Sequence, residues 1–228
     1  MVHHIGGEKT EMNLIFFGSP GSGKGTLAKL LSSKLGIPHI SPGDILREEV
    51  KKDSNLGRTA KPFMEKGELA PDEIILKMME KRIAQSDCGK GFMLDGFPRT
   101  IAQAVGLDEM LSRTNRNIDR VLKFEVSVDC AMRRLGGRRI CSVCGADFNL
   151  YTKPPLRENV CDICGGKLFQ RADDQEEVIL NRLKVYREET LPVEEHYNHQ
   201  GKLIRINSEP DPDTVLKEIL RVLNLGEG

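Results

Sequence analysis

The stretch Met12–Thr26, MNLIFFGSPGSGKGT, decides the fold of this 228-residue chain. Its first part, Met12–Phe17, is an apolar run that stops at a glycine, which is typical of a buried strand. The second part, Gly18–Thr26, fits the pattern Gly-x4-Gly-Lys with a hydroxyl residue one place later than usual. Leucines at helical spacing follow in Lys24–Leu35, and Gly36 is placed to close that helix. A strand, a glycine-rich loop and a helix in this order predict a phosphate-binding loop.

The chemistry of this loop follows from its residue types. Glycines let backbone N–H groups converge on phosphate oxygens, and the helix that begins near Lys24 directs its N-terminal dipole at the same anion. We expect Lys24 to reach the β- and γ-phosphates, and Thr26 to face the α- and β-phosphates or a magnesium shell, because Gly25 fills the usual Ser/Thr slot. The alternative is a plain glycine-rich turn. The residues expected around a triphosphate are Gly21, Ser22, Gly23, Lys24, Gly25 and Thr26.

The rest of the chain alternates short apolar runs with amphipathic segments. The further strands that we expect are Ile37–Ile40, Gly91–Asp95, Val121–Val126 and Leu203–Ile206. The further helices are Asp44–Lys51, Leu56–Lys66, Pro71–Gln85, Ile101–Arg113, Val128–Leu135, Asp173–Tyr197 and Asp213–Leu223. Pro192 should bend or end the longest of them. This alternation predicts an α/β fold with a parallel sheet, and the stretch from Gly136 to about Arg171 reads as an irregular insertion.

Composition excludes some partners. Lys plus Arg equals Asp plus Glu, at 34 each, so net charge favours no particular partner. Three tyrosines and no tryptophan leave little stacking surface for nucleic acid. Without an apolar run of about 18 residues or a signal-like leader, we expect no membrane association and a cytoplasmic location. Residues 1–11 read as a flexible tail, and the lack of heptads predicts a monomer.

Four cysteines form two Cys-x-x-Cys pairs, Cys141 with Cys144 and Cys161 with Cys164. A two-residue gap lets two thiolates hold one tetrahedral ion, and the distance between the pairs falls within the zinc pattern. Four thiolates would leave no open coordination position, so we expect a structural zinc that holds together an insertion too small for its own core. An iron–sulfur cluster and four unligated thiols are the alternatives, and disulfides are disfavoured in a reducing compartment.

Taken together, the motifs resemble the adenylate kinase family. They are GSPGSGKGT at 18–26, SPGDILR at 41–47, DGFPRT at 95–100, GRR at 137–139 and RADD at 171–174. The resemblance covers the chain from Met12 to its C-terminus, and the cysteine segment is similar to the zinc-bearing lid of the long-lid bacterial form. It implies a P-loop kinase core with a five-stranded parallel sheet, a helical flap that binds the nucleoside monophosphate, and a small lid. The implied divisions are core at 12–40, 71–136 and 175–228, flap at 41–70, and lid at 137–174.

The resemblance also implies a reaction and its residues: ATP and AMP would give two ADP, with magnesium. The residues implied in phosphoryl transfer are Lys24, Arg99, Arg138, Arg171 and Arg182. Beside the phosphate loop, the residues implied at ATP are Arg134, Arg138, Asp147 and Phe148. The residues implied at AMP are Arg47, Glu68, Leu69, Ala70, Gly96, Phe97, Pro98, Arg99, Gln103, Arg171 and Arg182.

Elementary chemistry suits these roles. Phosphoryl transfer needs in-line positioning and charge neutralisation, which planar, permanently charged guanidinium groups provide, although any single arginine could instead form a surface ion pair. Asp95, at a strand end, could hold magnesium through water. Gln103 carries a donor and an acceptor, so it can pair with an adenine edge. Asp173 and Asp174 read as caps of the long helix that follows.

Two departures from the family pattern bear on the bases. Pro42 stands where the family commonly has threonine, which puts the choice of acceptor base in question. The run Asn207–Pro210 replaces a more usual Asp-Gly-Thr near the last strand. A kinase for UMP, CMP or GMP is therefore an alternative, although the long lid and Gln103 argue against it. A zinc-ribbon nucleic-acid-binding protein with a vestigial nucleotide site is an alternative of another class.

Overall fold

The computed structural model describes residues 11–225, so the tail expected at 1–11 lies, except for Glu11, outside the described residues. Five parallel strands form the central sheet in the order β2-β3-β1-β4-β8. Their bounds are Met12–Gly18 (β1), His39–Ile40 (β2), Gly91–Asp95 (β3), Arg120–Glu125 (β4) and Leu203–Asn207 (β8). Phe16 pairs with Asp95 on one side and with Leu122 on the other, so the loop after β1 emerges beside the carboxyl end of β3. The expected α/β fold with a parallel sheet is confirmed.

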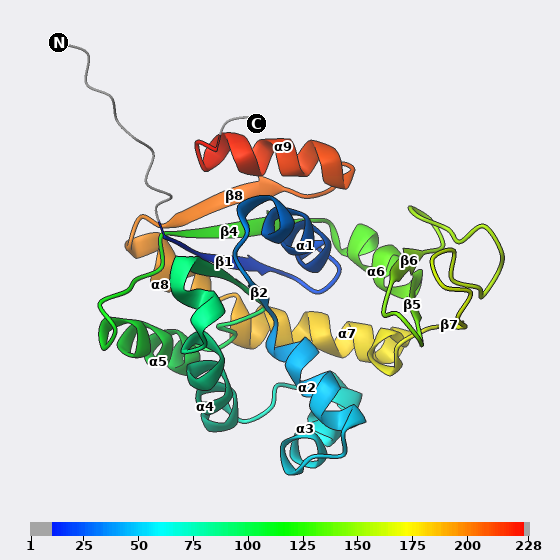
Figure 1. Ribbon diagram of the computed structural model, residues 1–228, viewed down its shortest axis with the longest axis horizontal. Helices are drawn as coiled ribbons and strands as arrows, with labels where there is room; N and C mark the ends of the chain where they lie inside the picture. The colour runs from blue at the N-terminus through cyan, green and yellow to red at the C-terminus, as the bar shows by residue number, and fades with distance from the viewer. Residues whose placement is uncertain (1–10, 226–228) are drawn as a thin grey trace.

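Helices cover both faces of this sheet (Figure 1). One face carries α1 (Lys24–Leu35) and α9 (Pro212–Val222), and the other carries α4 (Asp72–Ile83), α5 (Ile101–Ser112) and α8 (Val193–His199). Strand β1 shows why both layers form, because successive side chains of a strand point to opposite faces. Leu14 and Phe16 are buried among residues of α1 and α9, whereas Ile15 and Phe17 are buried in the cluster on the opposite face. A short 3-10 helix, η1 (Ser86–Lys90), precedes β3.

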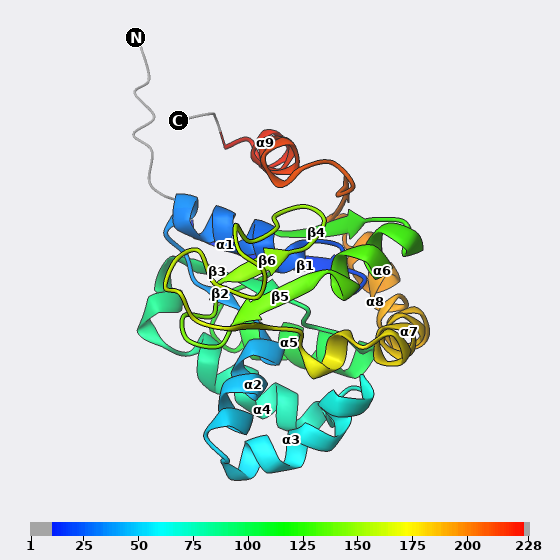
Figure 2. The same ribbon diagram turned by 90° about the vertical axis from the view of Figure 1, so that its right-hand side faces the viewer.

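Residues 41–70, called the flap below, hold α2 (Pro42–Lys51) and α3 (Asn55–Lys66), which project from the core (Figures 1 and 2). Ser41 and Ser54 cap the two helices by accepting hydrogen bonds from the backbone N–H groups of Asp44 and Gly57. The flap ends against the helix that follows the lid. Gly67 has φ 73°, and a Cβ atom there would lie 2.7 Å from Cγ of Arg182.

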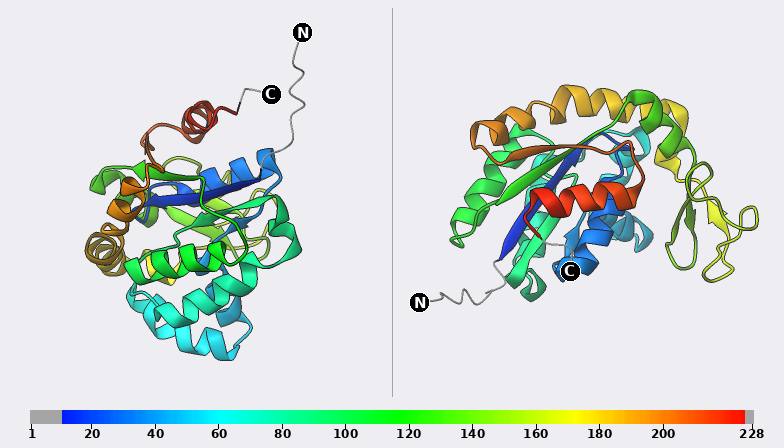
Figure 3. Two further views of the ribbon diagram at one scale, coloured as in Figure 1. Left: turned by 90° about the vertical axis from the view of Figure 1, so that its left-hand side faces the viewer. Right: turned by 90° about the horizontal axis from the view of Figure 1, so that it is seen from above.

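Residues 137–174, called the lid below, project from another side of the core (Figure 3). Helix α6 (Val128–Gly136) leads into it. We expected an irregular insertion, and this was wrong, because the lid contains a three-stranded antiparallel sheet in the order β6-β5-β7. Its strands are Arg138–Cys141 (β5), Asp147–Asn149 (β6) and Leu168–Phe169 (β7). Strands of two to four residues are too short to show a periodic pattern in the sequence.

The single long helix expected at Asp173–Tyr197 is divided in the structure. Its parts are a 3-10 turn, η2 (Ala172–Asp174), then α7 (Glu176–Val185), a π-helical turn, η3 (Tyr186–Thr190), and α8. The backbone N–H of Leu191 donates to the carbonyl of Tyr186, which is the wider bond of a π turn. Pro192, which has no N–H to donate, follows this turn directly. Within residues 11–225, no helix combines the length and apolarity that crossing a membrane requires.

Candidate functional site

The loop between β1 and α1 folds around the ammonium group of Lys24. Its Nζ donates to the carbonyls of Gly18 and Ser19, at 2.7 and 2.8 Å, and to Oγ of Ser22 at 3.2 Å. Gly21 has φ 82°, and a Cβ atom there would lie 2.7 Å from the carbonyl oxygen of Ala131, so the turn requires glycine. Burial lowers the pKa of Lys24 to about 8. A buried cation with only neutral hydrogen-bond partners is stabilised when an anion enters the loop.

Asp95, at the carboxyl end of β3, faces this loop. A Cβ atom at Gly25 would lie 3.3 Å from Oδ2 of Asp95, so a side chain in this slot would require Asp95 to shift slightly. Nε2 of His39 lies 3.1 Å from the same oxygen. The sequence did not mark His39, because a lone histidine at the start of a two-residue strand belongs to no motif. Asp95 therefore presents a carboxylate to the phosphate loop, and magnesium is commonly held by one or two carboxylates and water.

Arginines at both ends of the lid and in α7 gather around two aspartates. Arg138 binds Asp174 with both arms, from Nε to Oδ2 at 2.7 Å and from Nη2 to Oδ1 at 2.5 Å. Arg171 binds Asp173 in the same way, at 2.9 and 2.7 Å. Arg182 of α7 joins the two pairs, because its Nη1 lies 3.2 Å from Oδ2 of Asp173 and 3.3 Å from Oδ1 of Asp174.

The expectation that Asp173 and Asp174 cap the long helix was wrong. The N-cap residue of α7 is Gln175, and no side chain accepts a capping hydrogen bond there. The Asp174 side chain is completely buried, and guanidinium donors occupy both of its oxygens. The aspartates therefore act as counter-charges that hold the arginines in place.

The electrostatics of this cluster indicate an excess of positive charge. Burial lowers the pKa of Arg182 to about 10 and that of Arg171 below its usual range, and the charge of Arg138 adds to both effects. Although burial alone would raise the pKa of Asp173, Arg182 and Arg171 hold it at about 2. Burial also lowers the pKa of Arg99. Arg138 is the exception, because its hydrogen bonds to Asp174 outweigh burial and raise its pKa. Cations that are buried close together are stabilised when an anion binds between them.

A cavity of about 90 Å³ lies between the flap and the core. The residues expected at AMP that line it are Arg47, Glu68, Leu69, Ala70, Gly96, Arg99, Gln103 and Arg182, and Pro42 lines it as well. Phe97 does not, because its side chain is 1% exposed and belongs to the main core; a cis peptide joins it to Pro98. Arg171 faces Asp173 instead.

A hydrogen-bond network fixes the polar end of this cavity. Gln103 is only 2% exposed; its Oε1 accepts from the backbone N–H of Arg99 at 2.8 Å, and its Nε2 donates to Oδ1 of Asp72 at 2.7 Å. Oγ1 of Thr100 donates to the other Asp72 oxygen at 2.9 Å and accepts from the N–H of Gln103 at 3.1 Å. We did not predict Asp72 or Thr100. The spacing Thr-x-x-Gln before α5, which resembles a capping box, was the available signal.

Two of the residues expected at ATP, Arg134 and Asp147, lie on different elements. Arg134 of α6 lies beside the phosphate loop, and its Nη2 donates to the carbonyls of Ser208 and Glu209 in the β8–α9 connection, at 2.9 and 3.1 Å. Asp147 is exposed on the lid and forms an ion pair with Lys29 of α1 at 2.5 Å.

The side chain of Phe148 does not lie at the phosphate loop. It is 4% exposed and packs in the lid's own core with Cys141, Cys161 and Leu168. The resemblance placed it at the nucleotide, but the small lid needs this ring for its own apolar interior.

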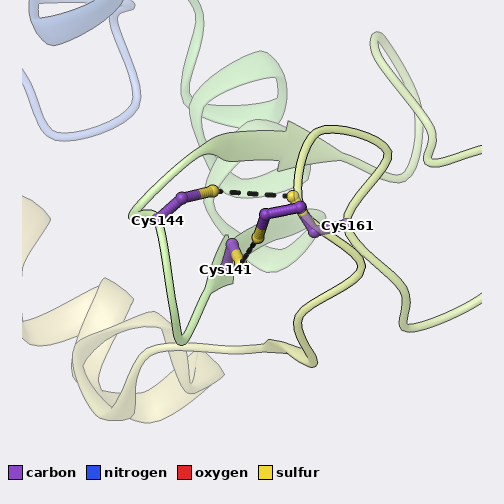
Figure 4. A group of neighbouring side chains, drawn as sticks. Cys141, Cys144 and Cys161 are labelled. Atoms are coloured by element: carbon purple, nitrogen blue, oxygen red, sulfur yellow. Dashed lines mark hydrogen bonds between the residues drawn. The ribbon is translucent and has the colours of Figure 1, made fainter.

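The four cysteines of the two pairs meet in the lid. Their sulfur atoms all lie within 4.8 Å of one another, with 3.5 Å between Cys141 and Cys164 and 3.6 Å between Cys144 and Cys161. Figure 4 shows the labelled side chains directing their sulfurs to a common centre. A tetrahedral ion with bonds of about 2.3 Å would place its sulfur ligands roughly 3.8 Å apart, so the cluster fits one zinc ion. Backbone N–H groups lower the pKa of Cys141, while hydrogen bonds with the neighbouring thiols raise that of Cys144, so the four sulfurs share protons that a bound metal would displace.

Comparison with known proteins decides the family. The family model named adenylate kinase matches residues 16–202. The chain belongs to the adenylate kinase family. The adenylate kinase of Caldicellulosiruptor saccharolyticus is 49% identical over 214 residues, which cover 94% of this chain and all of that protein. Those of Archaeoglobus fulgidus and of a Geobacillus species are 49% and 47% identical over 212 residues, covering 93% of this chain and 98% of each relative.

Membership of the adenylate kinase family confirms the resemblance drawn from the motifs and makes the protein a phosphotransferase. The roles of individual residues, and the division into flap, lid and core, stay predictions. The structure brings Lys24, Asp95 and the arginines of the lid and of α7 to the same side of the sheet, where the strands end.

Proposed function

We propose that this protein transfers the γ-phosphoryl group of ATP to AMP and so produces two molecules of ADP. The observation that carries the proposal is that more cations than carboxylates are buried between the phosphate loop and the cavity beside the flap, namely Lys24, Arg99, Arg138, Arg171 and Arg182 against Asp95, Asp173 and Asp174. The pKa values of Lys24 and Arg182 are both lowered, to about 8 and about 10, and each is affected by the charge of Arg138. Such a site stabilises a chain of phosphates that reaches from one nucleotide to another.

The reaction that we propose needs no general base. A phosphate monoester has its second pKa near 6, so an oxygen of the AMP phosphate is already anionic at neutral pH. This oxygen attacks the γ-phosphorus in line, a new P–O bond forms, and the bond from the γ-phosphorus to the bridging β-phosphate oxygen breaks. The electron pair of the broken bond leaves with the β-phosphate of ADP. Residues of the chain therefore position the phosphates and neutralise charge.

The residues divide this work by their location. We assign Lys24 and the backbone N–H groups of the loop to the β- and γ-phosphates. Arg138, Arg171 and Arg182 would neutralise the transferring group, and oxygens of that group would replace part of the aspartate contacts described above. Arg99, which lines the cavity and whose Nε is now held by the Gly96 carbonyl at 2.8 Å, would bind the AMP phosphate together with Arg47.

Two metal ions complete the proposal. Magnesium bound with ATP supplies positive charge along the phosphates and fixes their conformation, and Asp95 would hold part of its water shell. The four cysteines would hold a structural zinc that gives the lid a stable interior.

Binding of AMP requires movement. Nucleotide sites have volumes of about 300 Å³ or more, whereas the cavity beside the flap measures about 90 Å³. We infer that the flap and lid open to admit substrates and close again, because closure excludes water that would otherwise accept the phosphoryl group.

The test is a panel of acceptors. Purified protein with ATP and magnesium is supplied with AMP, UMP, CMP or GMP at equal concentrations, and the nucleotides formed are separated and counted. We expect ADP from AMP in a ratio of two per ATP consumed, with the other acceptors slower. Lys24→Ala should remove most of the activity at an unchanged circular dichroism spectrum. Faster turnover of another acceptor, or no transfer at all, would refute the proposal, and light scattering of the same samples tests the expected monomer.

A further inference from the structure

Gln103 reaches the cavity beside the flap with a side-chain amide whose orientation is fixed by its neighbours. An amide can be rotated by half a turn, which exchanges its donor and its acceptor at almost no cost unless its partners decide between them. The partners here do decide. The backbone N–H of Arg99 can only donate, and the carboxylate of Asp72 can only accept, so Oε1 must face Arg99 and Nε2 must face Asp72.

Thr100 supplies the second hydrogen-bond donor to Asp72. Its Oγ1 accepts from the backbone N–H of Gln103 at 3.1 Å, so its hydroxyl proton is free to point at Asp72, and the two oxygens are 2.9 Å apart. Asp72 thus receives two donors, one on each carboxylate oxygen. No second orientation of the Gln103 amide keeps both bonds to Asp72 and Arg99.

The fixed amide still has hydrogen-bonding capacity for a ligand. A glutamine side chain has two N–H donors and two acceptor positions on its oxygen, and one of each is used by Asp72 and Arg99. Gln103 lines the cavity, so a base bound there would meet the remaining donor and acceptor in a fixed order.

This order distinguishes purine bases. Adenine offers an acceptor at ring nitrogen 1 and a donor at its 6-amino group, whereas hypoxanthine offers a donor at ring nitrogen 1 and an acceptor at its 6-oxo group. An amide that is free to rotate could pair with both bases. An amide that cannot rotate pairs with one and leaves buried, unsatisfied groups against the other.

We propose that Asp72 is a specificity-determining positioning residue, which selects 6-amino over 6-oxo purine monophosphates by fixing the orientation of the Gln103 amide. Asp72 does not line the cavity and acts through Gln103, while Thr100 occupies its second oxygen. The inference rests on the proposed function, because it assumes that the acceptor is bound in the cavity beside the flap. Residues 71–72 follow the flap directly. The same short segment therefore joins the flap to the core and carries the residue that fixes the orientation of the Gln103 amide.

The test compares AMP with IMP, which differ at the 6-position and in the resulting ring proton. With ATP and magnesium, kcat and KM are measured for both acceptors with the wild-type protein and with Asp72→Asn, Asp72→Ala and Glu73→Gln. Glu73 is an exposed acidic residue in the same first turn of α4, so its variant controls for loss of charge at this position. For the wild type we expect kcat/KM for AMP to exceed that for IMP by at least about a hundredfold.

In Asp72→Asn, the introduced amide can turn its NH2 group toward Gln103, so that only the backbone N–H of Arg99 still opposes the rotated orientation. The AMP-to-IMP ratio should then fall by about tenfold to a hundredfold, the worth of one hydrogen bond to a charged group. Asp72→Ala should lower the ratio less, because alanine offers no donor that would favour the rotated orientation, while Arg99 opposes that orientation in both variants. Glu73→Gln should leave the ratio unchanged.

The outcomes separate the two levels of the proposal. If the wild-type protein does not phosphorylate AMP, the proposed function itself is wrong. If it phosphorylates AMP but accepts IMP within tenfold, the amide is not locked, and this measurement needs no variant to fold. If both Asp72 variants lose activity on AMP and IMP in equal proportion, or lose none, Asp72 has a structural role only and the inference is overturned.

Discussion

The Asp174→Asn substitution tests the idea that two aspartates hold the arginine cluster together. It changes the shape of the side chain very little and removes its charge. Asp174 is 1% exposed, and its two oxygens receive three guanidinium contacts, two from Arg138 at 2.7 and 2.5 Å and one from Arg182 at 3.3 Å. The substituted amide would place its own N–H donors against these guanidinium donors.

The expected size of the effect follows from this burial. Removing one partner of a buried ion pair costs about 3–5 kcal/mol. Arg138 retains a quarter of its side-chain exposure, so water can hydrate part of the released charge, and we expect about 3 kcal/mol. For a chain of this length each kcal/mol lowers Tm by about 2–4 °C, which gives a decrease of about 6–12 °C.

The assay is thermal and urea unfolding of the wild type and of Asp174→Asn without nucleotides. Asp129→Asn serves as the matched control, because Asp129 is exposed in the first turn of α6 and its substitution should change the free energy of unfolding by less than about 0.5 kcal/mol. An Asp174→Asn protein within about 1 kcal/mol of the wild type would show that the arginines do not depend on this carboxylate.

Three further outcomes are expected. Because Arg182 and Arg171 hold the pKa of Asp173 at about 2, below its ordinary value of 3.8, that carboxylate should contribute about 2 kcal/mol of stability at neutral pH. The difference in unfolding free energy between wild type and Asp173→Asn should therefore shrink as pH falls from about 5 to 2; a constant difference would contradict this. Since burial lowers the pKa of Lys24 to about 8, ATP binding at about pH 8.5 should take up protons, measured by calorimetry in buffers of different ionisation enthalpy. Lys24→Arg should lose this uptake. Removal of the lid metal by a chelator, or Cys144→Ser, should speed proteolysis within 137–174 while the core retains its circular dichroism, and equal protection with and without metal would argue against the zinc site.

The parts of the fold that can be predicted from the sequence are those defined by a pattern of neighbouring residues. The apolar run of β1, the glycines after it and the leucines of α1 are neighbours in the chain, so their pattern identifies strand, loop and helix directly. The same holds for Gly91–Asp95, whose predicted bounds agree with β3 residue for residue.

What the sequence could not reveal depends on partners far apart in the chain. Arg138 and Asp174 are 36 positions apart, and Gln103 and Asp72 are 31 positions apart, so no local pattern marks either pair. The sequence suggested that Asp174 caps a helix, because it lies just before α7. The arginines that bind its carboxylate can be identified only from the fold. Phe148 was placed at the nucleotide by resemblance alone.

The lid is joined to the core by two stems, and each stem carries one arginine of the cluster. Arg138 is the first residue of β5, and Arg171 immediately precedes η2. If the lid opens outward as we infer, both guanidinium groups would move away from the phosphate loop with it, so the movement that releases product would also remove two charges from the transfer site. If the lid opens as we infer, a triphosphate on the loop would then meet a site without these two charges, and water would gain little help in attacking it.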